Sequence, residues 1–292
     1  MEDDGEYELC GTALHEAELI KLGNGDIARG QLLYAQRELE RAEQAFGATD
    51  PRLAVPLWNL ADVYEEMGRL EDADPLSRRA HELTAASAPN SQLATRVFGY
   101  ALRLSDRGKH EESLPLYERA LAIAETVAGA DSLAMLLSGY AEALRRVGRA
   151  AEAEAAYRRV LDVARERQKG AAGAFSLIGA LQGIAETLGD QTRFDEAESC
   201  YEQALAELGR LVGEGGWKVG ELLDDWAKLR RRANKPELAH ALEARALRVF
   251  RHHLSQVDEE DTRDPEIQNR IASLTSRLAM AARKAPTSER PA

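Results

Sequence analysis

Aromatic residues and cysteine are scarce in this sequence of 292 residues. Phe, Trp and Tyr make up 5% of the chain, and its two cysteines are Cys10 and Cys200. So few rings are typical of a helical protein and argue against the aromatic-rich core of a β-sandwich or barrel. The cysteines form no CxxC motif and no Cys/His cluster, so neither a disulfide framework nor a zinc site is indicated.

A long apolar run and a basic start are also missing. The most apolar stretch, residues 171–185, ends at Glu186, short of the roughly 20 residues of a membrane span. The first residues are acidic and lead into no hydrophobic segment, unlike a secretory signal. We therefore expect a cytoplasmic protein with no membrane partner.

Positive charge is in deficit. The chain has 38 basic and 50 acidic residues, and its formal net charge of −12 repels phosphate backbones at long range. Nucleic acid is therefore not expected as a partner. Arg far outnumbers Lys, and together with frequent Ala this usage resembles that of proteins from GC-rich bacterial genomes.

Motifs for catalysis or metal binding are missing too. The His-Glu pairs at 15–16, 81–82 and 110–111 begin like HExxH, but no second His follows. Residues 23–28 imitate a dinucleotide fingerprint, yet they follow a segment that reads as helix rather than strand. There is no Walker A or GxSxG motif. We expect no enzyme, no cofactor and no metal site.

What the sequence does contain is one unit repeated six times. A small or turn-forming residue is followed five positions later by Ala or Ser, and seven positions after that by Ala or Val. The middle residues recur every 40 to 45 positions, a period typical of helix-pair solenoids. The triplets are Gly23/Ala28/Ala35, Gly68/Ala73/Ala80, Gly108/Ser113/Ala120, Gly148/Ala153/Val160, Thr192/Ala197/Ala204 and Asn234/Ala239/Ala246.

Each position of the unit has a physical reason. Antiparallel helices approach closely only where side chains are small, and a glycine in the left-handed conformation ends the first helix. Another small residue stands seven positions before the turn in five units: Ala61, Ala101, Ala141, Ala185 and Ala227. Four residues after the middle position comes a mostly bulky residue that packs beside the small ones: Leu32, Ser77, Tyr117, Tyr157, Tyr201 and Glu243.

These features resemble tetratricopeptide repeat (TPR) proteins of the longer, kinesin-light-chain-like type. The most similar stretches are residues 57–61, 71–80 and 111–121, and the linkers 46–54 and 127–134 resemble inter-repeat turns of that family. The resemblance implies an all-α, right-handed superhelical solenoid whose first helices line a concave groove. We expect a solenoid over residues 1–254, with repeats near 8–45, 51–86, 91–127, 131–168, 172–212 and 217–253.

The end of the chain predicts a cap. Asp264 and Pro265 suit a helix start, and apolar residues from Ile267 to Ala281 recur at three- and four-residue steps. We expect a capping helix over 264–284 and a disordered tail over 285–292, whose composition lacks apolar content.

The resemblance also implies which residues face a partner in the groove. We expect a peptide or helical segment of another protein there, bound by an adaptor or scaffold; the alternative is an intracellular sensor of a small signalling peptide or metabolite. The oligomeric state stays open. The expected groove residues are Trp58, Asn59, Asp62, Phe98, Gly99, Leu102, Ser138, Gly139, Glu142, Arg145, Gln182, Gly183, Glu186, Lys228 and Arg231.

Three features of this set have two interpretations. Gly99, Gly139 and Gly183 occupy one helical position, where glycine costs roughly 1 kcal/mol relative to Ala. Either a partner approaches closely there, or the glycines reflect tight helix packing or drift from a duplicated ancestor. On the first interpretation, Gly139→Ala should preserve or raise stability. Trp58 and Phe98 are either exposed anchors or core residues. Arg145 and Arg231 either steer a bipolar partner or are ordinary solvated charges.

Overall fold

The computed structural model describes residues 24–127, 133–167, 171–256 and 265–284. In these ranges the chain contains twelve α-helices and one 3₁₀ turn, and no strand, which confirms the expected all-α repeat solenoid. The elements are α2 (Asn24–Phe46), η1 (Pro51–Leu53), α3 (Ala54–Glu66), α4 (Leu70–Leu83), α5 (Ser91–Asp106), α6 (His110–Thr126), α7 (Leu133–Arg146), α8 (Ala150–Arg167), α9 (Ala171–Asp190), α10 (Phe194–Val212), α11 (Trp217–Arg232), α12 (Pro236–Leu254) and α13 (Pro265–Lys284).

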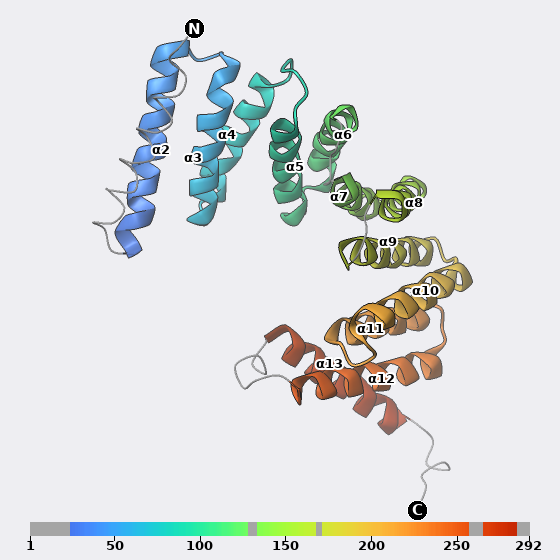
Figure 1. Ribbon diagram of the computed structural model, residues 1–292. Helices are drawn as coiled ribbons and strands as arrows, with labels where there is room; N and C mark the ends of the chain where they lie inside the picture. Colours follow the sequence, from blue (N-terminus) through green and yellow to red (C-terminus); the bar gives the residue numbers. More distant parts are fainter. Residues whose placement is uncertain (1–23, 128–132, 168–170, 257–264, 285–292) are drawn as a thin grey trace, which may run out of the picture. The chain divides into compact units, whose positions relative to one another are not determined.

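Two compact units divide the chain, residues 1–100 and residues 101–292, and the boundary falls within α5. In the first unit α3 packs against α2 and α4. In the second, hairpins follow one another along the chain: α7 pairs with α8, α9 with α10, and α11 with α12 (Figure 1). Successive hairpins also stack, because α8 contacts α9, α10 contacts α11, and α12 contacts α13.

The turns inside the hairpins have the backbone conformation that the repeat predicts. Gly68, Gly108 and Gly148 have φ values of 71°, 75° and 81°, and Thr192 and Asn234 take the same left-handed conformation at 62° and 58°. A backbone hydrogen bond closes each turn. In the fourth repeat the Arg149 amide donates to the Leu144 carbonyl over 2.9 Å. These bonds satisfy carbonyls that the end of a helix leaves without partners.

The small residues of the repeat form the core seam. Ala61, Ala101, Ala141, Ala185 and Ala227 on the first helices have no exposed surface, and neither do Ala73, Ser113, Ala153, Ala197 and Ala239 on the second helices. The bulky neighbours Tyr117, Tyr157 and Tyr201 are buried beside them. Close approach of the helices at alanine explains why the repeat tolerates only small residues at these positions.

The last described helix, α13, begins at Pro265 and buries Ile267 and Leu274. It packs against α12, the second helix of the preceding hairpin. Four expectations concern residues outside the described ranges. They are the first helix of repeat 1, the N-cap at Asp264, the tail over 285–292, and Gly23, the first residue of the segment that imitates a dinucleotide fingerprint. The six-repeat division with its terminal cap stays a prediction.

Candidate functional site

A chain of charges links the first helices α7, α9 and α11 of the second unit. Arg145 on α7 bonds Glu142 on its own helix at 2.8 Å and reaches Glu186 and Asp190 on α9 at 3.2 and 3.1 Å. Asp190 in turn accepts from Arg232 on α11 at 2.9 Å. We call these five residues the charge ladder. The contacts of Arg145 with Glu186 and Asp190, and of Arg232 with Asp190, join first helices of neighbouring repeats, whereas the Arg145–Glu142 contact lies within α7.

Burial and neighbouring charges shift the pKa values of Glu142 and Glu186 in opposite directions. Only 15% of the Arg145 side chain is exposed, so its charge is weakly screened by water. Burial alone would raise the pKa of Glu142, but hydrogen bonds from Arg145 and Arg146 outweigh it and hold that pKa below its ordinary value. At Glu186 burial prevails, with Asp225 and Glu142 adding to it, and the pKa is raised. Of Glu142 and Glu186, Glu186 is therefore the carboxylate whose charge its neighbours compensate less.

A second set of polar contacts joins α9 to α11. The Gln182 amide donates to Asp225 at 2.9 Å and, more weakly, to Glu186 at 3.3 Å. Asp225 also pairs with Lys228 at 2.7 Å, one turn along α11. The groove residues Gln182, Glu186 and Lys228 that the sequence predicts thus lie in one connected network.

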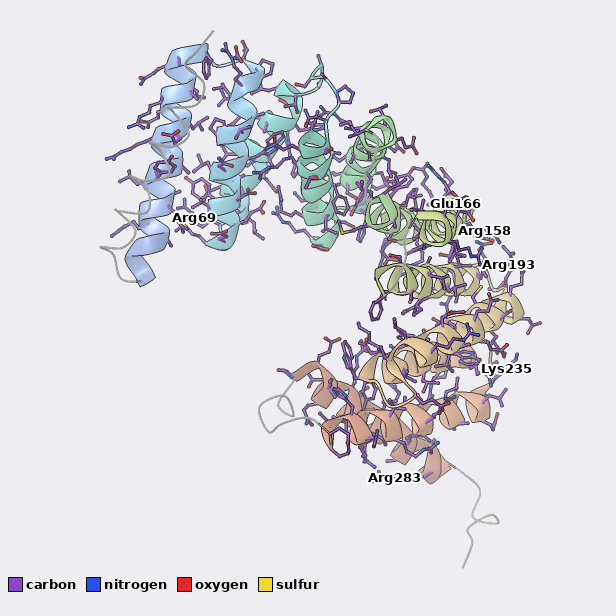
Figure 2. The ribbon with its side chains drawn as sticks, in the orientation of Figure 1. Arg69, Arg158, Glu166, Arg193, Lys235 and Arg283 are labelled. Atoms are coloured by element: carbon purple, nitrogen blue, oxygen red, sulfur yellow. The ribbon has the colours of Figure 1, made fainter. Side chains whose placement is uncertain are left out.

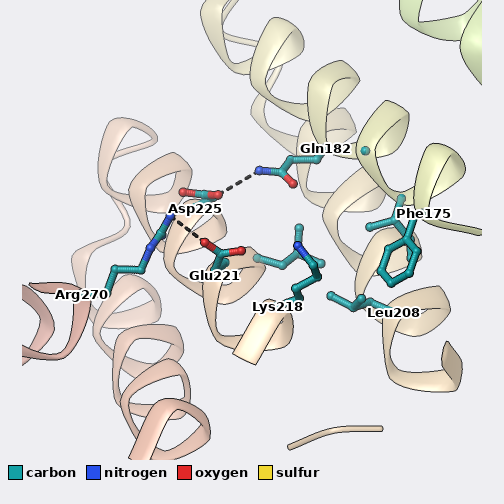
Figure 3. A pocket seen from close by; sticks show the side chains of 10 residues that line it. Phe175, Gln182, Leu208, Lys218, Glu221, Asp225 and Arg270 are labelled. Atoms are coloured by element: carbon teal, nitrogen blue, oxygen red, sulfur yellow. Dashed lines mark hydrogen bonds and ion pairs between the residues drawn. The ribbon is translucent and has the colours of Figure 1, made fainter. Parts of the chain in front are cut away.

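Next to this network lies an open pocket of about 440 Å³. Its wall comes from α9 and α11, its floor includes the buried Leu208 of α10, and Arg270 of α13 reaches it from the far side (Figure 3). We call it the α9–α11 pocket. Its lining residues are Phe175, Ile178, Gly179, Gln182, Leu208, Lys218, Glu221, Leu222, Asp225 and Arg270.

The pocket combines apolar and charged surfaces. Phe175 is 41% exposed, so the pocket has an accessible apolar ring at its edge. Glu221 pairs with Arg270 at 2.8 Å, and its burial raises its pKa. Lys218 lies over the Trp217 ring, with its Nζ 4.3 Å from the ring centroid. An apolar floor with polar groups around it suits binding of a side chain with flanking polar atoms.

The sixth repeat has Glu243, which is 1% exposed, where the third, fourth and fifth repeats have a buried tyrosine. Its carboxylate accepts from Arg231 on α11 at 2.6 Å and from Arg277 on α13 at 2.8 Å. Arg277 also donates to the buried Asp224. The departure from the repeat pattern therefore supplies a carboxylate that holds the last helix in place.

The structure assigns the predicted groove arginines to internal contacts. Arg145 is 15% exposed and belongs to the charge ladder, so it is neither the free steering charge nor the ordinary solvated charge that the sequence suggested. This corrects both interpretations of Arg145, because first helices of adjacent repeats lie close enough for its long side chain to pair across them. Arg231 pairs with the buried Glu243 of α12 while its own side chain stays 36% exposed.

The predicted aromatic anchors of the first unit are core residues. Trp58 is 5% and Phe98 7% exposed, so neither can serve a partner as an exposed anchor. Beside them Arg96 pairs with Asp62 at 2.5 Å and donates to Asn59 at 3.3 Å. Asn59 and Asp62 of the first unit thus lie at the surface, and both already contact Arg96.

The two predicted glycines in the second unit have an internal explanation. A Cβ at Gly183 would lie 2.3 Å from a ring carbon of Tyr157, and one at Gly139 would lie 2.9 Å from a ring carbon of Tyr117. Tight packing accounts for both, which corrects the expectation that Gly139→Ala leaves stability unharmed. Gly99 is half-buried, Leu102 is 39% exposed, and the Ser138 hydroxyl donates to the Ala134 carbonyl of its own helix.

Sequence reasoning missed Phe175, Gly179, Lys218, Glu221 and Arg270. Four of them lie one to three turns before the predicted groove positions on the same helices, so helical periodicity could have found them. Arg270 comes from α13, outside the repeats, and only the fold brings it to the pocket. The described residues hold no cluster of three metal-ligating side chains. Among the described helices, none has the length and apolarity to cross a membrane.

Comparison with known proteins gives this helical-hairpin architecture a family. The tetratricopeptide repeat profile matches residues 93–166, and a second profile of the same description matches residues 178–206. These residues of the chain are therefore tetratricopeptide repeats. No curated protein matches the sequence. Tetratricopeptide repeats generally mediate interactions between proteins or serve as scaffolds.

Solved structures share the fold at low identity. A putative kinesin light chain from Podosopora anserina, with nearly identical TPR-like repeats, is 14% identical with a TM-score of 0.54, over 72% of this chain and 98% of that one. A tetratricopeptide repeat protein from Parabacteroides merdae is 17% identical with a TM-score of 0.52, over 90% and 99%. PilW, a type IV pilus biogenesis factor, is 16% identical with a TM-score of 0.51, over 84% and 98%.

Proposed function

We propose that this chain is a non-enzymatic adaptor or scaffold that binds a peptide or helical segment of another protein on the faces of α7, α9 and α11. The observation that carries the proposal is the α9–α11 pocket, an open apolar site with an exposed Phe175 at its edge. The groove residues proposed to contact the partner are those around it, with Gln182 and Glu186 at the centre.

The contacts around the pocket support binding over catalysis. Glu142, Glu186, Glu221 and Asp225 are each engaged by a basic or amide side chain, so they are held as structural charges. The raised pKa values of Glu186 and Glu221 follow from burial first and from neighbouring charges second, as in ordinary ion-pair networks. A rigid frame beside an open apolar pocket favours recognition because little side-chain entropy is lost on binding.

A second candidate is a sensor of a small signalling peptide or metabolite. The volume of about 440 Å³ falls within the usual range for small-molecule sites, which extends from about 300 to 1,000 Å³. The two candidates differ in what raises the thermal stability of the purified chain. A sensor responds to molecules below about 1 kDa from a dialysable extract, whereas an adaptor responds only to the protein fraction.

A site-specific photocrosslink tests the proposal. We place a benzophenone amino acid at Phe175, and in a matched variant at Leu238 of α12, which is similarly exposed but does not line the pocket. Irradiation in a lysate of the source organism should attach discrete polypeptides at position 175 and not at position 238. Equal labelling at both positions, or labelling at 238 alone, contradicts binding at the pocket.

A further inference from the structure

A second open cleft, of about 520 Å³, lies between the second helices α10 and α12. It runs over α11, which contacts both of these helices (Figure 1). The cleft shares no residue with the α9–α11 pocket. We call it the α10–α12 cleft, and its lining residues are Glu202, Leu205, Ala206, Gly209, Arg210, Glu214, Val219, Trp226 and Arg245.

The floor of the cleft is apolar but contains one unsatisfied donor. Val219 and Trp226 of α11 are 1% and 7% exposed, and the Trp226 indole N–H donates no hydrogen bond among the described residues. A buried donor without an acceptor is unfavourable, and an occupant of the cleft can supply one. The wall on α10 is open at Gly209, because a Cβ there would meet nothing within 4 Å.

The second half of α12 carries arginines that lack strong ion pairs. Arg248 and Arg251 are exposed and form no ion pair among the described residues. Arg245 reaches only Glu214, at 4.0 Å, and that glutamate is 89% exposed. We call these three arginines the basic row. By contrast, each arginine of α10 and α11 pairs with a carboxylate within 3.4 Å.

The helix dipole explains only part of the basic row. It favours cations in the last turn of a helix, and Arg251 lies there because α12 ends at Leu254. Arg245 and Arg248 lie before that turn, where the effect of the dipole has fallen off. Residues 244–256 contain no Asp or Glu, so α12 itself offers these two arginines no partner.

The excess of positive charge comes from α12 and not from the cleft lining. In the lining, Glu202 and Glu214 balance Arg210 and Arg245. The basic row continues along α12 beyond the lining and adds two further arginines. At physiological salt the Debye length is about 8 Å, so the acidic residues elsewhere in a chain of net charge −12 are screened from a partner bound there.

We propose that the α10–α12 cleft and the basic row form a second docking surface, which binds an acidic segment of a partner protein. The segment carries two carboxylates one helical turn apart, next to one large apolar residue. The carboxylates pair with Arg245 and Arg248, and the apolar side chain enters the cleft over Val219. This goes beyond the function proposed above, because an adaptor that joins two proteins needs two separate surfaces.

A peptide selection supplies the probe. Random 12-residue peptides displayed on phage are selected on the full chain, and those that also bind an Arg248→Glu variant are removed. The dominant peptide is synthesised with a fluorophore for anisotropy titration. We expect two Asp or Glu residues three or four positions apart, beside one Phe, Leu, Ile or Met. Raising the salt concentration from 50 to 300 mM should weaken binding.

Two glycine variants separate the cleft from the α9–α11 pocket. Gly209→Leu fills the cleft and should weaken peptide binding at least tenfold without lowering the melting temperature, since leucine favours a helix over glycine. Gly179→Leu is the matched control, because a Cβ at Gly179 also meets nothing within 4 Å but this residue lines the other pocket. It should leave the affinity unchanged within twofold.

Two charge reversals test the basic row independently of the selection. Arg245→Glu should weaken peptide binding at least tenfold. Arg165→Glu is the control, because Arg165 is an exposed arginine of the second helix α8 that forms no ion pair among the described residues. It should leave the affinity unchanged within twofold, and equal weakening by both reversals would reduce the row to a non-specific attraction and overturn the inference.

The remaining outcomes keep this inference apart from the proposed function. Full affinity of Gly209→Leu, or no peptide left after the removal step, overturns the inference, and the photocrosslink at Phe175 still decides the proposed function. Weakening by Gly179→Leu instead places the peptide in the α9–α11 pocket, which overturns the inference and supports the proposed function. Leu238 stays a valid crosslinking control, because it lies two turns before Arg245 and away from the rest of the basic row.

The chain's own acidic residues are the competing occupant of the basic row. Residues 258–261 are all Asp or Glu. Replacing these four by Asn and Gln should leave the affinity for the selected peptide unchanged within twofold. Binding that is at least tenfold tighter in this variant would mean that residues 258–261 compete for the row, which overturns a surface free for a partner.

Discussion

Tyr157 connects the packing of the helices to the charges of the groove. Its ring covers Gly183 on the next first helix, and its hydroxyl donates to Glu142 of the charge ladder at 3.1 Å. Burial is the main reason that its pKa is raised, and the neighbouring Glu142 carboxylate adds to the effect. One buried side chain thus sets both the distance between repeats and the position of a groove carboxylate.

A methyl group at Gly183 should therefore be costly. Gly183→Ala forces the Tyr157 ring to shift, because the new Cβ would lie 2.3 to 2.7 Å from three of its carbons. Overpacking of this kind costs about 1–3 kcal/mol, which should appear as a lower free energy of unfolding in urea. Gly139→Ala, with contacts of 2.9 to 3.2 Å to Tyr117, should cost less. A Gly183→Ala variant as stable as the parent contradicts this packing.

Thr192 is strained at the turn of the fifth repeat. Its φ is 62°, a conformation that a β-branched residue rarely adopts, whereas the equivalent turns use Gly68, Gly108 and Gly148. Thr192→Gly should therefore raise the free energy of unfolding by about 1 kcal/mol. Asn234→Gly is the control and should gain less, because Asn tolerates the left-handed region. Urea unfolding of the two variants checks the order, and a larger gain for Asn234→Gly would contradict it.

At the scale of elements, α13 is held to the preceding hairpin by ion pairs as well as by apolar contacts. Arg277 bonds Glu243 and Asp224, both of which are nearly inaccessible to water, and Arg270 pairs with Glu221. A buried carboxylate that loses its cation is strongly destabilising. The helix therefore stabilises two acidic residues that belong to the repeats.

Removing Arg277 tests this arrangement. Arg277→Ala leaves Glu243 with Arg231 alone, and should lower the free energy of unfolding by about 2–4 kcal/mol. Hydrogen exchange should show α13 and α12 opening before α7 and α8. Arg283→Ala, an exposed position near the end of α13, is the control and should change little (Figure 2). Uniform loss of protection along the chain would contradict a local role for Arg277.

At the scale of the whole molecule, stability should depend on pH through the charge ladder. The folded-state pKa of Glu142 lies below its ordinary 4.5, so its charge stabilises the fold above that value, and the contribution is lost as pH falls through the lowered pKa. The pKa of Glu186 is raised, so its contribution has the opposite sign. Glu142→Gln should therefore flatten the loss of stability below about pH 5, and Glu186→Gln should steepen it.

Urea unfolding between pH 3.5 and 7 measures both slopes. The variants remove one carboxylate each from the same ladder, so each serves as the control for the other. Equal slopes in the two variants would mean that Arg145 is shared evenly between Glu142 and Glu186, contrary to the geometry.

Much of the architecture could be predicted from short-range patterns. The recurrence of Gly68, Gly108 and Gly148 forecasts the left-handed turns, and the alanines of the seam forecast the contacts inside each hairpin. These predictions succeed because residues within one hairpin are near in sequence, so backbone conformation and side-chain size decide them locally.

The candidate site was predictable only in part. The resemblance to the repeat family placed Gln182, Glu186 and Lys228 in one groove, but it also gave Arg145 and Arg231 to a partner, and the roles of Trp58 and Phe98 stayed open. The reason is that the same position on a helix can point to solvent, to a neighbouring repeat or into the core. Which of these applies depends on long side chains from other repeats, whose reach a single repeat does not reveal.

The sequence by itself determined the helical hairpins, because small residues and turn conformations at fixed spacing leave few other ways to bury the apolar faces. Only the tertiary structure decided that Tyr157 fills the space over Gly183 while Gly179 stays open, and that Arg270 and Arg277 of α13 complete the charges of α11 and α12. These outcomes depend on distances between helices that are remote in sequence, and such distances follow from packing rather than from any local pattern.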